Sequence, residues 1–205
     1  MNETTHITAR HRDYTGSKIG MWLFLVTELC LFFGPVLLFA MNDIKYPTEF
    51  HAASGALDRT LGTLNTVILL TSSLTAALSV ASVRRGNNSL AVFLLMMTIA
   101  LGGVFLFNKY FEWGEKIAHG IYPGSPGLAK LSAGEAVFYG LYFFTTGLHA
   151  LHVLAGMALL SVMSVLTAAG KVDKNDFIKL ENSALYWHLV DIVWIYLFPL
   201  FYLIS

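Results

Sequence analysis

One stretch decides the fold: Gly140-Leu-Tyr-Phe-Phe-Thr-Thr-Gly-Leu-His-Ala-Leu-His-Val-Leu-Ala-Gly156. It lies inside a run from Ala136 to Gly170 that contains no Asp, Glu, Lys or Arg. A transmembrane helix needs about 20 predominantly apolar residues, so this run is long enough to cross a bilayer. His149 and His152 nevertheless lie near its middle. Because an ionisable side chain at that depth is costly, these two histidines need a reason to be there.

The composition places the whole chain among membrane proteins. Of its 205 residues, 56% are hydrophobic and only 13% are charged, and the mean hydropathy is +0.62. Thirteen basic and thirteen acidic residues cancel, so no net charge favours a nucleic-acid partner. The single cysteine, Cys30, excludes an internal disulfide and cysteine-rich metal motifs. The polar N-terminal residues do not resemble a cleaved signal peptide, so the first apolar segment is expected to be retained as an anchor.

Hydropathy predicts an all-α bundle of five transmembrane helices in a single membrane domain, residues 1–205. The expected segments are residues 19–42, 60–83, 89–110, 136–168 and 182–204. Residues 43–59 are expected to form a loop, and residues 113–135, with Pro123 and Pro126, an irregular interfacial connection. Eight Lys and Arg lie at the end of the bundle that holds the N-terminus, against five at the other end. This bias predicts a cytoplasmic N-terminus and an external C-terminus.

Polar residues recur along one face of the fourth segment. Tyr142, Thr145, His149, His152 and Gly156 follow one another at three- and four-residue steps. One interpretation is that both histidines are neutral and hydrogen-bonded across a helix contact. The alternatives are a haem or metal ligand, a proton relay, or a contact with a lipid headgroup.

Depth excludes the haem alternative. His188, the other histidine within a segment, lies roughly 8 Å from the inner end of the fifth segment, whereas His152 lies roughly 22 Å from the inner end of its own. A haem cannot bridge that difference. His149 and His152 alone, on one helix, have no obvious further metal ligands, which disfavours a metal site.

Several other polar residues lie within the segments. Glu28 is near the middle of the first segment, either as a protonated acid at a helix contact or as a proton-exchanging or lipid-facing carboxylate. His188 and Asp191 are neighbours on one helix face and are expected to form a local pair, with Trp187 as part of an interfacial anchor. Asn65, Ser72 and Ser79 recur every seven residues and predict close helix packing. Lys109 and Glu112 are expected to form a solvated pair at a helix end.

Taken in order, the segments resemble subunit III of the haem-copper terminal oxidases. The first segment, Gly20-Met-Trp-Leu-Phe-Leu-Val-Thr-Glu28, looks like that family's helix with an intramembrane carboxylate. Leu64-Asn65-Thr66 followed by Ser72-Ser73 is similar to its second motif, and Phe107-Asn-Lys109-Tyr-Phe-Glu112-Trp113 to its Gln-x-x-Glu-Tyr motif, with Lys109 in place of glutamine and Trp113 in place of tyrosine. Gly147-Leu-His149-Ala-Leu-His152 and Tyr186-Trp187-His188-Leu-Val-Asp191-Ile-Val-Trp194 resemble its two most distinctive signatures.

The resemblance implies a short, five-helix bacterial subunit III of the cytoplasmic membrane, in a cytochrome c oxidase or its close relative, a quinol oxidase. Glu28 and the Leu-Asn-Thr pattern favour the cytochrome c branch. Such a chain is expected to carry no active site, cofactor or metal of its own. Haem and copper belong to the partner subunits, subunit I above all and subunit II beside it. The implied role is to stabilise subunit I, support its proton uptake and bind phospholipid. The candidate buried or lipid contacts are Glu28, His149, His152, Trp187, His188 and Asp191.

Three rival hypotheses remain open at this point. An accessory subunit of a nitric oxide reductase would share the fold. An independent proton-coupled transporter could use the buried ionisable side chains as a relay, although no inverted repeat is visible. A small membrane cytochrome b would contradict the depth argument above.

Overall fold

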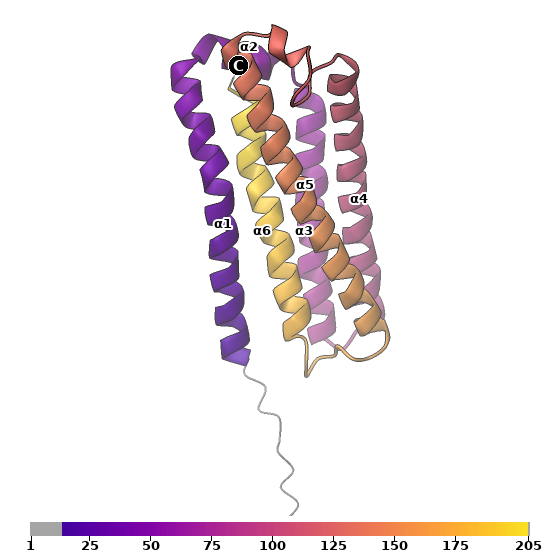
Figure 1. The fold of residues 1–205 in the computed structure, drawn as a ribbon. Helices are drawn as coiled ribbons and strands as arrows, with labels where there is room; N and C mark the ends of the chain where they lie inside the picture. The colour runs from indigo at the N-terminus through magenta and orange to yellow at the C-terminus, as the bar shows by residue number, and fades with distance from the viewer. Residues whose placement is uncertain (1–13, 205) are drawn as a thin grey trace, which may run out of the picture.

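The computed structural model describes residues 14–204 as a bundle of long helices (Figure 1). The elements are α1 (Tyr14–Lys45), α2 (Pro47–Gly55), α3 (Arg59–Arg84), α4 (Asn88–Ala118), the 3₁₀ helix η1 (Leu128–Lys130), α5 (Ala133–Ala168) and α6 (Ile178–Tyr202). Within this described range, five helices (α1, α3, α4, α5 and α6) are long and apolar enough to cross a membrane. The predicted all-α bundle of five spans is confirmed. Arg10 and Arg12, which contribute to the predicted orientation, lie outside the described residues, so the orientation stays a prediction.

The five long helices run from one end of the bundle to the other (Figure 1). The start of α1, the α3–α4 turn and the α5–α6 loop lie at one end, and α2, η1 and the end of α6 lie at the other. Helix α3 packs against α4 and α6, and α5 packs against the same two helices. Helix α1 packs more loosely against α5 and α6 and exposes many of its apolar side chains. A soluble protein would bury such a face, so lipid or a partner subunit is its expected neighbour.

Helix boundaries follow local sequence signals. The Ser132 hydroxyl accepts a hydrogen bond from the backbone N–H of Glu135, and the Glu135 carboxylate accepts one from the Ser132 N–H, which makes a capping box at the start of α5. Asp58 and Asn87 cap α3 and α4 in the simpler way, each accepting from a backbone N–H three residues on. Gly86, at φ +79°, allows the tight turn between these two helices.

Two connections differ from the expectation. The predicted loop at residues 43–59 contains α2, whose Phe50 is fully buried and whose Ser54 hydroxyl donates to the Phe201 carbonyl at 2.7 Å. The third segment does not end near residue 110, because α4 continues to Ala118. Charged residues interrupt the apolar run there but not the helix, and Lys116 on the added turns donates to the Ala56 carbonyl at 2.7 Å.

Trp187 of α6 lies at the centre of the four packed helices. It is fully buried, and its indole Nε1 donates to the Ser72 hydroxyl of α3 at 3.0 Å. A Cβ atom added to Gly102 of α4 or to Gly156 of α5 would lie 2.7 Å from the Trp187 ring. One large side chain from α6 therefore fills space that two glycines leave open on neighbouring helices. Trp187 is a core residue, and its expected place in an interfacial anchor is wrong.

The small polar residues of α3 do what their spacing predicts. Asn65, Ser72 and Ser79 are fully buried at the contacts of α3 with its neighbours. The Asn108 side chain of α4 donates to Asn65 at 2.8 Å. The prediction of close helix packing at these positions is confirmed.

Candidate functional site

Glu28 of α1 and His152 of α5 form a hydrogen-bonded pair between two helices. The Nε2 atom of His152 lies 2.8 Å from Oε2 of Glu28, although the two residues are 124 positions apart in the chain. Both side chains are mostly buried, with 16% and 14% of their surface exposed. The ring of Phe32 packs edge-on against the His152 ring at 5.1 Å. The pair is therefore a polar contact in apolar surroundings that ties the loosely packed α1 to the bundle.

The hydrogen bonds of His152 determine how many protons the pair holds. Its Nδ1 lies 2.8 Å from the Leu148 carbonyl, which can only accept, so Nδ1 carries a hydrogen. The contact between Nε2 and Glu28 then contains one shared proton. Either a neutral carboxylic acid donates to the neutral ring, or an imidazolium donates to a carboxylate.

We expect Glu28→Ala to lower the free energy of unfolding by about 1–3 kcal/mol, because it leaves the mostly buried Nε2 of His152 without a partner. Glu28→Gln should cost less, because its amide can still donate to Nε2. Thr27→Ala is the matched control, since the exposed Thr27 hydroxyl bonds only within its own helix, to the Phe24 carbonyl. Unfolding of the purified protein in mixed detergent micelles measures all three. Equal stability of Glu28→Ala and Thr27→Ala would show that the pair contributes nothing.

His149 lies on the same face of α5 but deeper in the bundle. It is fully buried between the ring of Phe105, whose centre is 5.5 Å away, and the ring of Trp194, at 5.2 Å. Within residues 14–204 neither ring nitrogen has a hydrogen-bond partner. The nearby Thr145 hydroxyl also lacks one. Buried polar atoms without partners often hold ordered water, so this part of the face is suited to water rather than to a dry contact.

The two remaining candidates on α6 are not partners of each other. His188 is half-buried, and its Nδ1 lies 2.6 Å from the hydroxyl of Ser73 on α3. Asp191 is 2% exposed, and neither of its carboxylate oxygens accepts a hydrogen bond from the described residues. The expected local pair of His188 and Asp191 is therefore wrong. The residues share a face, but the ring of His188 points to α3.

A fully buried polar cluster lies where α4, α5 and α6 meet. Lys109 donates from Nζ to Glu112 at 3.0 Å, to the Tyr142 hydroxyl at 3.0 Å and to the Tyr202 hydroxyl at 2.9 Å. Both tyrosines also donate to Oε1 of Glu112. The Lys109 and Glu112 side chains are only 2% and 3% exposed. The expected solvated pair is therefore wrong, because both charged side chains are buried and their hydrogen-bond partners lie inside the bundle.

Sequence reasoning missed this cluster although its signals were visible. Lys109 and Glu112 stand three apart, and Tyr142 belongs to the polar face of α5. The error was to end the helix near residue 110, which placed the pair in the interface. With α4 continuing to Ala118, the same residues lie inside the bundle.

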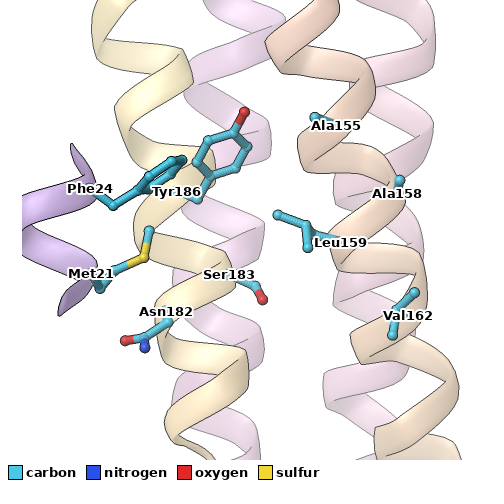
Figure 2. A pocket seen from close by; sticks show the side chains of 9 residues that line it. All are labelled: Met21, Phe24, Ala155, Ala158, Leu159, Val162, Asn182, Ser183 and Tyr186. Carbon is cyan, nitrogen blue, oxygen red and sulfur yellow. The ribbon is translucent and has the colours of Figure 1, made fainter. Parts of the chain in front are cut away.

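A cleft opens between α1 and α5, with α6 between them. It has a volume of about 600 Å³ and an almost entirely apolar lining. Figure 2 shows Met21 and Phe24 of α1 on one side, Leu159 and Val162 of α5 on the other, and Tyr186 of α6 among them. Phe24 lies one helical turn from Glu28, so the Glu28–His152 contact lies about one turn beyond the end of the cleft. An apolar cleft open to the membrane suits a lipid chain.

The comparison with known proteins agrees with this arrangement. A family model described as cytochrome c oxidase subunit III matches residues 2–205. The chain belongs to the cytochrome c oxidase subunit III family. The five spans make this family member a multi-pass membrane protein, and the family places it in a haem-copper oxidase complex of the respiratory chain. The predicted family is confirmed.

Three relatives show the range of the family. A probable quinol oxidase subunit 3 from Staphylococcus haemolyticus is 26% identical over the whole chain and 96% of the relative. A cytochrome c oxidase subunit 3 from Strongylocentrotus purpuratus is 30% identical over 91% of the chain and 69% of the relative. A haem-copper oxidase subunit I+III from Aeropyrum pernix is 30% identical over 95% of the chain. The chain spans only 24% of that last relative.

Proposed function

We propose that this chain is the subunit III that packs beside the catalytic subunit I of a haem-copper terminal oxidase, in the cytoplasmic membrane of a bacterium. The observation that carries the proposal is the Aeropyrum pernix relative, whose name joins subunits I and III in one polypeptide. A fusion enforces one copy of each and keeps them adjacent. The chain studied here supplies a helix suited to such contact, since α1 exposes apolar side chains along most of its length.

In this proposal the chain carries no redox centre and acts by stabilising subunit I. The Glu28–His152 pair holds α1 on the bundle, and the Lys109–Glu112 cluster holds α4, α5 and α6 together. These contacts keep the surface that subunit I meets in one conformation, which sustains its activity and its proton uptake. The haem, the copper and the choice between cytochrome c and quinol as electron donor belong to subunits I and II.

Native mass spectrometry of the affinity-purified chain, with a haem spectrum of the same sample, tests the proposal. We expect one haem-copper catalytic subunit for each copy of the chain. We also expect the oxidase to lose activity after fewer turnovers when the chain is removed. Purification of the chain with no haem-copper subunit in stoichiometric amount would overturn the proposal.

The cleft between α1 and α5 adds a lipid to the proposed role. Its volume of about 600 Å³ lies within the range of small-molecule sites, and its apolar lining fits acyl chains. We expect the native mass spectrum of the complex to retain phospholipid. Leu159→Trp, which fills the cleft, should reduce the retained lipid, whereas Leu90→Trp, at an exposed position of α4, should not. Equal lipid content in the two variants contradicts this occupant.

A further inference from the structure

A second cavity runs from one end of the bundle to His188, one helical turn from the buried carboxylate of Asp191. This groove has a volume of about 270 Å³ and lies between α3 and α6. Residues Ala77 to Arg84 of α3 form one wall, and Glu181 to His188 of α6 form the other. At its outer end Arg84 donates to Glu181 at 2.8 Å, with half of the Arg84 side chain exposed. At its inner end lies His188.

Beyond His188 a polar chain continues to Asp191. The Nδ1 atom of His188 is bonded to the Ser73 hydroxyl at 2.6 Å. The Ser73 hydroxyl also faces Asp191 across the α3–α6 contact, but the two side chains are not hydrogen-bonded in this arrangement. Asp191 itself follows His188 by three residues on the same helix face. The groove, the imidazole, the hydroxyl and the carboxylate therefore lie in sequence from the end of the bundle inward.

Asp191 lacks the partners that a buried carboxylate needs. It is 2% exposed, and both of its oxygens are without a hydrogen bond from the described residues. None of the ion pairs among those residues includes Asp191. An unpaired ionised carboxylate in an apolar interior is strongly disfavoured. We therefore expect the Asp191 carboxylate to bind a cation, and the smallest cation is a proton.

The other charged or titratable groups that the neighbouring helices direct toward α6 already have contacts of their own. Arg84 of α3 and Lys18 of α1 bind Glu181. The remaining ionisable side chains near α6 also contact groups other than Asp191. These side chains are Glu28 of α1, His149, His152 and Tyr142 of α5, and Lys109 and Glu112 of α4. Helix α2 meets α6 through the uncharged Ser54. No fixed cation is therefore placed to neutralise Asp191.

We propose that Asp191 is a proton-binding site that exchanges with the end of the bundle through the α3–α6 groove, His188 and Ser73. The site is distinct from the Glu28–His152 pair and goes beyond the supporting role proposed above. A hydronium ion in the groove gives its proton to Nε2 of His188. Nδ1 of His188 passes its own proton to the Ser73 oxygen, and the Ser73 hydroxyl, after rotating toward Asp191, gives its proton to the carboxylate. One proton leaves the groove, one is added to Asp191, and no electron moves.

Infrared spectroscopy of the purified complex tests the site. We expect the carbonyl-stretch band of one protonated carboxylic acid to be present in the unaltered complex and absent in Asp191→Asn. Asp191→Glu should move the frequency of this band without abolishing it, which identifies the band if the asparagine variant fails to assemble. Persistence of the complete set of carboxylic bands in Asp191→Asn would overturn the proposal. So would a band that responds to sodium concentration at constant pH, because the bound cation would then be a metal ion.

The route is tested by the rate at which the same band shifts after transfer into D₂O. Ser73→Ala and His188→Phe should slow that shift by about a hundredfold, the contribution typical of a positioned proton-transfer group. Ser73→Thr keeps the hydroxyl and should leave the rate close to that of the unaltered complex. Glu28→Gln, which changes a mostly buried carboxyl group on α1 outside this route, should not affect it. Unchanged exchange in both Ser73→Ala and His188→Phe would refute the route through the groove.

Discussion

Glu112→Gln is expected to lower the free energy of unfolding by about 3–5 kcal/mol, the loss typical when one member of a buried ion pair is removed. The ammonium of Lys109, only 2% exposed, would keep its charge but lose the carboxylate that neutralises it. The amide oxygen of glutamine can still accept from the Tyr142 and Tyr202 hydroxyls, so the expected loss comes from the missing negative charge opposite Lys109. The three helices that meet at this cluster would then separate more easily.

Replacing Lys109 instead of Glu112 should lower the free energy of unfolding by a smaller amount. Lys109→Gln leaves Glu112 with the two tyrosine hydroxyls as donors, and glutamine is the residue that the resembling family motif usually carries at this position. We expect a loss of about 1.5–3 kcal/mol, the contribution typical of a hydrogen bond to a charged group. The double variant Lys109→Met with Glu112→Leu should come close to neutral, because no charge then remains buried. The cluster therefore stabilises the bundle when both charged side chains are present, and removing only one of them destabilises it.

Unfolding in mixed micelles and the amount of chain retained in the complex measure this series. Glu115→Gln is the matched control, because Glu115 is an exposed residue of the same type on the same helix. The free energy of unfolding of Glu115→Gln should equal that of the unaltered chain. If Glu112→Gln is no less stable than Glu115→Gln, the cluster contributes nothing to stability, and the double variant should then show no recovery either.

The fold was largely predictable because membrane spans leave a strong one-dimensional signal. A charge-free run such as residues 136–170 can only be a long helix in lipid, and α5 ends at Ala168 as expected. What hydropathy cannot measure is where a helix continues beyond the apolar stretch. Phe111 to Ala118 include three charged residues and still belong to α4, because their contacts with the bundle hold them helical. Helix α2 was missed for the same reason, since a short helix depends on packing rather than propensity.

The sequence predicted which helix face the candidate site residues share, but not which residues of other helices they contact. The spacing of Tyr142, Thr145 and His149 placed them together, and all three are buried on the same side of α5. Helical spacing cannot say that His152 meets Glu28, 124 residues away, because that depends on the depth and rotation of two helices. The same limit explains His188. Its neighbour Asp191 is near in sequence, but the rotation of α6 directs the ring to Ser73 of α3.

The second large effect is expected at Trp187. Trp187→Ala should lower the free energy of unfolding by about 3–5 kcal/mol, because it removes one of the two largest fully buried side chains and leaves a cavity between four helices. Trp187→Phe retains much of the ring and loses the donor to Ser72, so it should cost less. Thermal unfolding of the purified complex ranks the two variants. A loss in Trp187→Ala no greater than that in Trp187→Phe would mean that the helices close over the space.

The glycines that face Trp187 allow the packing to be tested from the other side. Gly156→Ala places a methyl group 2.7 Å from the indole ring and should cost about 1–3 kcal/mol, as overpacking does. Gly147→Ala on the same helix, where an added methyl group meets nothing within 4 Å, should be neutral or slightly stabilising. Combining Gly156→Ala with Trp187→Leu should destabilise less than the sum of the two single changes, because each alters the space that the other occupies. Strict additivity would show that the two residues do not share that space. Gly102 and Gly156 let α4 and α5 approach the Trp187 ring of α6, so this contact fixes how these three helices fit together.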